Sequence, residues 1–254
     1  MIKKNFQINI CDNREESGKV AAQEVAKSIR TLLAEKKEIN IVFGAAPSQD
    51  KLLKYLNLEA GIEWERIHAF HMDEYIGLAS DSPQSFASYL NKHIATKVPF
   101  KSINYLNGIT TNLEDECKRY TALLKKHPID IVCLGFGENG HIAFNDPGIG
   151  IFSEKTWVKI VELDQKCRQQ QVNDACFEFI EQVPTHALTL TIPAMLSGAN
   201  LICTVPSVKK ANAVKNAILG PVSEKCPASI LRLHQSVRII LDKDSSSLLM
   251  RIKG

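Results

Sequence analysis

Residues 134–147 read Leu-Gly-Phe-Gly-Glu-Asn-Gly-His-Ile-Ala-Phe-Asn-Asp-Pro and follow an apolar run over residues 129–134. A short apolar run of this kind predicts a buried strand. Glycine permits positive φ and lets another backbone or a ligand come close, so Gly135, Gly137 and Gly140 predict a tight turn after that strand. A turn at the carboxyl end of a strand is where an open α/β sheet binds its ligand.

Three polar side chains in six residues, His141, Asn145 and Asp146, follow these glycines. A purely structural turn would explain the glycines but not the histidine and the carboxylate. The glycines also fit the G-x-G-x-x-G pattern of dinucleotide-binding folds, which requires a helix directly after the turn. Pro147 ends any helix within two turns, so we expect a site for a different kind of ligand.

The composition is that of an ordinary soluble globular chain, with 44% hydrophobic and 23% charged residues among 254. The net charge is only +3 and there is no strong basic block, so we expect no nucleic-acid partner. No apolar run approaches the roughly 20 residues of a membrane-spanning helix, and no signal peptide is evident, so we expect no membrane partner. The seven cysteines are spread singly without a C-x-x-C pair. This spacing predicts neither a disulfide framework nor a zinc cage and favours the cytoplasm.

Strand and helix patterns alternate along the whole chain. Strands are predicted at residues 6–10, 39–43, 67–71, 129–134, 156–163, 187–192, 201–205 and 237–241. Helices are predicted at residues 13–36, 47–56, 82–94, 112–126, 164–180, 207–218 and 226–233. Alternation of this kind predicts an α/β fold with a doubly wound, mostly parallel sheet and helices on both faces. No internal repeat or linker is present, so we expect residues 1–254 to form a single domain.

Two segments have the features of an anion site. The small-residue turn Gly44-Ala45-Ala46-Pro47-Ser48 joins a predicted strand to a helix start, where backbone N–H groups favour a phosphate. Lys209 stands beside Ser207 at the start of another helix, although a solvated helix charge would look the same. Arg168 lies in a polar helical run that also fits an exposed helix face.

The carboxylates Asp73 and Glu74 follow the predicted strand at residues 67–71, at the sheet edge where ligands bind. Two adjacent carboxylates favour a shifted pKa for one of them. The alternative for Asp73 is a helix cap or a surface turn. A metal site that includes His68 and His71 is disfavoured, because side chains three positions apart on a strand point to opposite faces. We therefore expect no metal.

Four segments in one order resemble the glucosamine-6-phosphate deaminase/isomerase family, which is related to the 6-phosphogluconolactonases. They are residues 72–78 (Met-Asp-Glu-Tyr-Ile-Gly-Leu), 106–108 (Leu-Asn-Gly), 135–145 and 183–189 (Val-Pro-Thr-His-Ala-Leu-Thr). The resemblance covers nearly the whole chain. It implies an enzyme without a cofactor that converts glucosamine 6-phosphate or galactosamine 6-phosphate, with water, to a ketohexose 6-phosphate and ammonia.

The resemblance also implies a role for each matching residue. Asp73 would move a proton from C2 to C1 of the sugar, and His141 would assist ring opening while Asn139 and Asp146 orient it. The residues that would hold the substrate and its phosphate are Gly44, Ala45, Ala46, Ser48, Glu74, Gly137, Arg168 and Lys209.

The chain departs from the family pattern at several of these positions. The phosphate turn lacks the usual threonine, for which Ser48 is the substitute. Asn139 stands where aspartate is frequent, and Asp146 replaces a glutamate that is one methylene longer. The phosphate-binding arginine of the family falls at about Asn173, and Arg168 is the nearest candidate. These changes leave open which amino sugar is used and whether activity is full.

Two alternative functions remain from the sequence. The first is a hydrolase that resembles the 6-phosphogluconolactonases, although residues 142–145 differ from that branch. The second is a sugar-phosphate-binding protein without catalysis; we predict no helix-turn-helix ahead of residue 5 and no basic face, which disfavours a DNA-binding regulator. A homo-oligomer is compatible with the sequence, and the basic residues of an allosteric site are not evident between residues 149 and 158.

Overall fold

Seven parallel strands form the main sheet of the computed structural model, which describes residues 5–79 and 81–249. In spatial order they are β1 (Asn5–Cys11), β10 (Ser236–Asp242), β9 (Asn200–Val205), β6 (Ile131–Leu134), β2 (Ile39–Phe43), β3 (Ile67–His71) and β5 (Ser102–Asn104). Every neighbouring pair is parallel. The predicted α/β class and the parallel sheet are confirmed.

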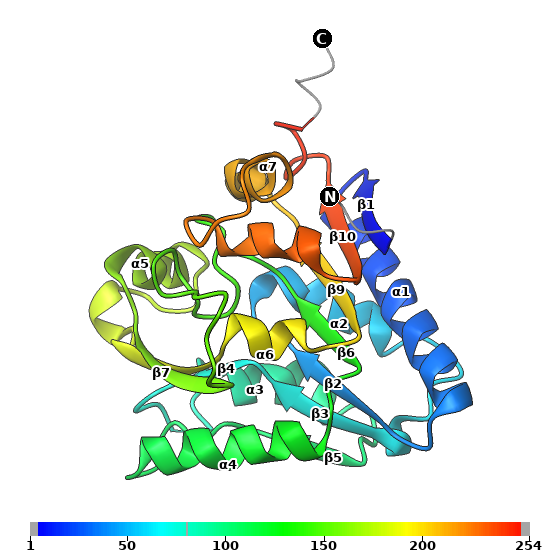
Figure 1. Ribbon diagram of the computed structural model, residues 1–254, viewed down its shortest axis with the longest axis horizontal. Helices are drawn as coiled ribbons and strands as arrows, with labels where there is room; N and C mark the ends of the chain where they lie inside the picture. Colours follow the sequence, from blue (N-terminus) through cyan, green and yellow to red (C-terminus); the bar gives the residue numbers. More distant parts are fainter. Residues whose placement is uncertain (1–4, 80, 250–254) are drawn as a thin grey trace.

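Helices cover both faces of this sheet (Figure 1). Helices α1 (Arg14–Glu35), α2 (Asp50–Leu56) and α3 (Phe86–Leu90) share one apolar cluster, whereas α4 (Leu113–Lys126), α6 (Ile192–Leu196) and α7 (Ala211–Leu219) share the other. Successive strand residues alternate between the two clusters, as Ile41 and Val42 do on β2. The near-continuous apolar runs of the central strands follow from this burial on both faces.

A second, antiparallel sheet lies beside the main one and consists of β4 (Asp73–Tyr75), β8 (His186–Leu190) and β7 (Val158–Glu162). Figure 1 shows β4 and β7 apart from the parallel strands. The sequence analysis expected residues 156–163 and 187–192 as strands of a mostly parallel sheet, whereas β7 and β8 pair antiparallel in the second sheet, and it predicted no strand at β4. Residues 73–75 become a strand only because β8, more than a hundred residues later, supplies their hydrogen-bond partners.

Several element boundaries also differ from the prediction. The helix predicted from residue 82 begins at Phe86, because Ser85 rather than Ser82 caps it and accepts the N–H of Ser88. The helix predicted over residues 164–180 is α5 (Gln165–Asn173), which is capped by Asp164 and ends early. The short elements β5 and α6 were not predicted. We expected the strand at residues 237–241 to be the last strand of the sheet. Instead β1 pairs with it and forms the edge, so β10 is an internal strand.

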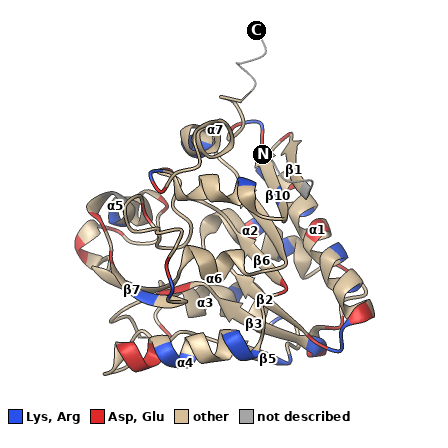
Figure 2. Ribbon diagram, viewed as in Figure 1, with Lys and Arg blue, Asp and Glu red and all other residues tan. Residues whose placement is uncertain are grey.

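Charged residues are distributed along the helices. No helix among the described residues is long and apolar enough to cross a membrane. Helix α4 begins with acidic residues and ends with basic ones, which Figure 2 shows as red and blue ends. This order complements the helix dipole, because acids favour the N-terminus and bases the C-terminus.

Candidate active site

A cavity of about 370 Å³ lies at the carboxyl end of the main sheet. Its walls include the loops after β2, β6 and β9, which lie side by side because these three strands are neighbours in the sheet. The first loop supplies residues 44–49, the second residues 135–137, and the third residues 206–210 apart from Val208. Strand β4 and helix α5 also contribute to the wall. The site is therefore at the sheet edge that the sequence indicated.

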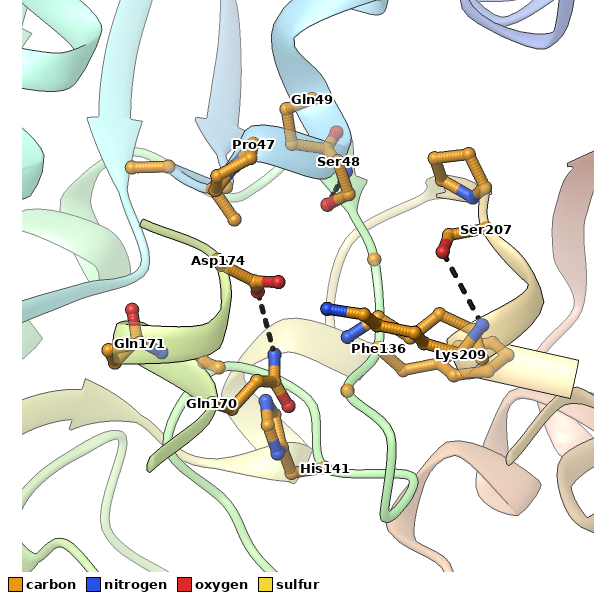
Figure 3. A pocket seen from close by; sticks show the side chains of 18 of the residues that line it. Pro47, Ser48, Gln49, Phe136, His141, Gln170, Gln171, Asp174, Ser207 and Lys209 are labelled. Carbon is orange, nitrogen blue, oxygen red and sulfur yellow. Dashed lines mark hydrogen bonds between the residues drawn. The ribbon is translucent and has the colours of Figure 1, made fainter. Parts of the chain in front are cut away.

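Two adjacent lysines line the cavity. Lys209 lines it, as predicted, but so does Lys210, whose side chain is only 8% exposed whereas Lys209 is exposed. Burial lowers the pKa of Lys210, although the charges of Asp174 and Glu138 oppose that change. The sequence analysis named only Lys209, because two adjacent lysines look alike until the turn Val208–Lys210 fixes their directions. Figure 3 shows Ser48, Ser207 and Lys209 around this region.

The arginine of the cavity is Arg14, which the sequence analysis did not propose. Its guanidinium donates a hydrogen bond to the carbonyl of Pro47 and lies 3.6 Å from the Asp50 carboxylate, and its side chain lines the cavity. Arg168 lies elsewhere: its guanidinium donates to the carbonyl oxygens of Ile180 and Val183 at 2.7 and 2.9 Å. Arg168 thus ties α5 to the following loop and does not line the described cavity, where the sequence analysis expected it to hold phosphate.

Asp73 lines the cavity from β4 and is buried. Burial raises the pKa of its carboxyl group well above the ordinary value, and the nearby charge of Glu74 adds to this effect. A carboxylate with raised proton affinity at the edge of a cavity is suited to general-base chemistry.

Glu74 points the other way and is not part of the described cavity wall. Its carboxylate accepts the backbone N–H groups of Tyr75, Phe86 and Ala87 at 2.9, 3.1 and 2.9 Å, and it lies 3.6 Å from Nε2 of His71. Burial alone would raise its pKa, but the hydrogen bond and charge of His71, together with the N–H groups, lower it. Among the described contacts, this side chain anchors the start of α3 and does not line the cavity as the sequence analysis expected.

His141 lines the cavity and is held from behind by two side chains. Its Nδ1 lies 2.8 Å from Oδ1 of Asn139 and 3.2 Å from Oδ1 of Asp146, and Nδ2 of Asn139 donates to Asp146 at 2.8 Å. Both neighbours of Nδ1 are acceptors, so we assign the proton to Nδ1 and leave Nε2 with its lone pair. The structure thus brings together the three residues that the sequence proposed, with Asn139 and Asp146 outside the cavity wall.

The pKa of the Asp146 carboxyl group is lowered. Burial by itself would raise it, but the hydrogen bond and the charge of His141, followed by the hydrogen bond of Asn139, outweigh burial. Asp146 is therefore ionised near neutral pH and stabilises a protonated His141.

Local backbone geometry supports this site in two ways. A Cβ at Gly137 would lie 2.0 Å from Cε1 of His141, so only glycine lets the ring occupy its place. The described residues other than glycine with positive φ are Ala143, Ala175 and Ser207, and each lines the cavity. Strained backbone of this kind clusters at functional sites.

Helix α5 and the residues after it form a polar wall that sequence reasoning did not assign to the site. Gln170, Gln171, Asn173 and Asp174 line the cavity, and Nε2 of Gln170 donates to Asp174 at 3.4 Å (Figure 3). The polar run around Arg168 was the available signal, but it also fitted an exposed helix face. Only packing against the sheet shows that α5 turns these amides towards the cavity.

Comparison with known proteins gives a consistent result. The chain matches the family described as glucosamine-6-phosphate isomerases/6-phosphogluconolactonase over residues 12–240. A glucosamine-6-phosphate deaminase of Listeria innocua is 36% identical over 244 residues, which cover 96% of this chain and all of that protein. A glucosamine-6-phosphate deaminase of Bacillus cereus is 35% identical over 229 residues, which cover 89% of this chain and 86% of that protein.

Solved structures agree with these relatives. The structure of a monomeric glucosamine-6-phosphate deaminase superposes with a TM-score of 0.86 at 31% identity and covers 95% of this chain and 99% of that one. A 6-phosphogluconolactonase from Thermotoga maritima has a TM-score of 0.76 at 19% identity over 94% of this chain and 100% of that one, and shares the fold. From the extent of these matches, the chain belongs to the family of glucosamine-6-phosphate isomerases and 6-phosphogluconolactonases.

Proposed function

We propose that this protein is an amino-sugar phosphate deaminase and isomerase, which converts glucosamine 6-phosphate or galactosamine 6-phosphate, with water, to a ketohexose 6-phosphate and ammonia. The observation that carries this proposal is the placement of Asp73 and His141 on the wall of one cavity that basic side chains also line. The similarity to deaminases along nearly the whole chain supports the same reaction.

Asp73 acts as the base of the isomerisation. Its carboxylate takes the proton from C2 of the open-chain sugar, the C2–H electron pair forms the C1–C2 double bond, and the π electrons of the C1 aldehyde move to O1, which takes up a proton. The carboxyl group then returns its proton to C1 while the nitrogen lone pair forms a C2–N double bond. Water adds to C2 of this iminium and ammonia leaves, which gives the ketose. The raised pKa of Asp73 brings its proton affinity closer to that of the carbon acid, which favours transfer in both directions. Burial keeps water from competing for this proton.

His141 opens the sugar ring. Nε2 takes the proton of the O1 hydroxyl and passes it to the ring oxygen, so that the ring bond breaks and the aldehyde forms. Asn139 and Asp146 hold the ring at Nδ1 and set its orientation. The negative charge of Asp146 stabilises the imidazolium that exists between the two proton transfers.

The basic side chains of the cavity wall bind the phosphate. Lys210, Lys209 and Arg14 supply positive charge, and the turn Gly44–Ser48 supplies small residues and the Ser48 hydroxyl. Gln170 and Asp174 face the sugar with amide and carboxylate groups that suit hydroxyl and amino substituents. Binding of the distant phosphate provides energy that orients C1 and C2 over Asp73.

The overall reaction consumes water and breaks a carbon–nitrogen bond, so we place this enzyme in the hydrolase class. We propose that residues 1–254 act as a single domain, on free sugar phosphates in the cytoplasm, and without a cofactor. Lys209 and Lys210 both serve the phosphate in this proposal, with the buried Lys210 as the stronger contact.

Ammonia release from a panel of compounds tests the proposal. We expect release from glucosamine 6-phosphate or galactosamine 6-phosphate, and at least a hundredfold lower kcat/KM for the same sugar without phosphate. Hydrolysis of 6-phosphogluconolactone, measured in parallel by pH-stat, tests the lactonase alternative. Lactone hydrolysis without ammonia release would overturn the proposal, and the absence of both activities would favour a binding protein.

A further inference from the structure

Behind His141 and Asp146 lies a third potential metal ligand, the thiol of Cys167. Cys167 belongs to α5 and is 1% exposed. One donor atom from each of these three side chains lies within 4.8 Å of the others, and no further group of three such residues was found in the described chain. Sequence spacing could not indicate this group, because Cys167 is far from the other two in the chain and no C-x-x-C pair marks it.

The Asp146 carboxylate has an unused oxygen in this group. Its Oδ1 accepts a hydrogen bond from Asn139 and lies near Nδ1 of His141, whereas Oδ2 has no hydrogen-bond partner among the described residues. Asp146 is 1% exposed, so this oxygen is shielded from bulk solvent. The neighbouring Cys167 thiol is only a weak donor. A buried carboxylate oxygen without a strong donor is costly, and a cation would remove that cost.

The donor set has a definite metal preference. Imidazole nitrogen, carboxylate oxygen and thiolate sulfur together suit Zn²⁺, which binds such ligands at about 2.0–2.3 Å in tetrahedral geometry. Ligand atoms around tetrahedral zinc are then roughly 3.5 Å apart, and the three donor atoms already lie within 4.8 Å of one another, so a small shift of the side chains brings them to zinc distances. One carboxylate and one thiolate also neutralise a divalent charge, which a buried site requires.

We propose that His141, Asp146 and Cys167 form an inhibitory Zn²⁺ site. On binding, the thiol of Cys167 loses its proton to solvent, and the imidazole proton moves from Nδ1 to Nε2, so that the ring stays neutral. Zinc then takes Nδ1 of His141, Oδ2 of Asp146 and Sγ of Cys167, with a water as the fourth ligand. The metal is not a cofactor of the reaction.

Bound zinc would stop ring opening, because Nε2 of His141 then carries a proton and can no longer accept one. This consequence rests on the proposed function, whereas the binding of the metal does not. The two are therefore measured separately, first by metal spectroscopy without substrate and then by activity.

Titration of the full chain with Co²⁺, a spectroscopic substitute for zinc, tests the site. We expect a thiolate-to-cobalt charge-transfer absorption in the near ultraviolet, with one equivalent bound, and its loss on addition of Zn²⁺. Cys167→Ser and Cys167→Ala should lack this absorption and bind zinc at least tenfold more weakly in competition with a chromogenic chelator. Cys176→Ser, a change in a half-buried cysteine three residues beyond the end of α5, is the matched control and should behave like the wild type.

Activity measured with and without zinc completes the test. Zinc should inhibit the wild type and Cys176→Ser reversibly, with recovery on addition of a chelator. The ratio of activities with and without zinc should be close to one in both Cys167 variants at the same zinc concentration. No thiolate-to-cobalt absorption in the wild type, or unchanged absorption in both Cys167 variants, would overturn the proposal even if the enzyme activity is as proposed.

Discussion

The two faces of strand β4 carry adjacent carboxylates with opposite properties. Asp73 lines the cavity and its pKa is raised, first by burial and then by the charge of its neighbour. Glu74 lies on the other side, accepts three backbone N–H groups and sits beside His71, and its pKa is lowered. Both side chains are buried, so burial alone does not distinguish them.

The difference follows from strand geometry and from what each face meets. Successive side chains on a strand point to opposite sides, so neighbours in sequence face different surroundings. The Glu74 face meets unpaired N–H groups at the start of α3, which stabilise a negative charge. No hydrogen bond to the Asp73 carboxylate is present among the described contacts, and its ionised form is therefore disfavoured. A buried carboxylate that accepts several N–H groups is held in its ionised form and serves the structure. A buried carboxylate without such donors has a raised pKa and is suited to act as a base.

The largest expected effect comes from removing the base. Asp73→Asn keeps the size of the side chain and should lower kcat by ~10²–10⁴, the range for loss of a general base, while KM changes little. The measurement is ammonia release together with exchange of deuterium at substrate C2, which should stop. Glu74→Gln is the matched control and should keep kcat within about tenfold when folded. Exchange at the wild-type rate in Asp73→Asn would show that Asp73 is not the base.

The second effect is on stability and concerns the other face. Glu74→Ala leaves buried N–H groups without an acceptor and should cost about 3 kcal/mol of unfolding free energy, measured by urea denaturation. Glu162→Ala, which removes an exposed carboxylate of β7, should change stability by less than about 0.5 kcal/mol. The folded pKa of Glu74 is lowered, so its contribution is present above the ordinary glutamate range and is lost as pH falls through the folded pKa. An unchanged difference between wild type and variant at acid pH would contradict this account.

A smaller effect, on KM, should distinguish the two lysines that line the cavity. Lys210→Ala should raise KM for the phosphorylated sugar at least tenfold, about 1.4 kcal/mol, because the buried ammonium makes a charge-assisted contact with little competition from water. Lys209→Ala should raise KM less, because its side chain is exposed. Steady-state kinetics on both variants decide the order. A larger effect at Lys209 would restore the assignment that the sequence alone favoured.

The smallest effect is the stability consequence of the raised pKa of Asp73. A folded pKa above the unfolded value contributes stability at low pH and loses it as pH rises through the folded pKa. The wild type should therefore be less stable than Asp73→Asn at pH 8, and the difference in Tm should vanish near pH 4, close to the ordinary aspartate value of 3.8. Calorimetry at the two pH values checks the sign. If Asp73→Asn is instead less stable than the wild type at pH 8, the Asp73 carboxylate of the folded protein has a stabilising hydrogen-bond or charge partner.

Much of the fold was predictable because its signals are local. The strands at residues 39–43 and 67–71 have the predicted bounds, since a continuous apolar run between turn residues is sufficient to mark a buried strand. The helix predicted over residues 112–126 is α4, which begins after Asn112 because the Asn112 side chain accepts the N–H of Asp115 within the same turn. The glycine-rich turn also placed His141 next to Asn139 and Asp146, because the three residues lie within eight positions of one another.

The remaining features of the site depend on contacts between distant segments. Strand β4 exists only because β8 pairs with it, and the opposed roles of Asp73 and Glu74 follow from that pairing. Arg14 reaches the cavity from the start of α1, and Cys167 reaches Asp146 from α5. The sequence by itself determined the buried strands marked by continuous apolar runs, the glycine-rich turn and the chemical groups available for the reaction. The tertiary structure decided which of these groups meet, because their distances depend on how strands and helices pack, and local patterns carry no information about that packing.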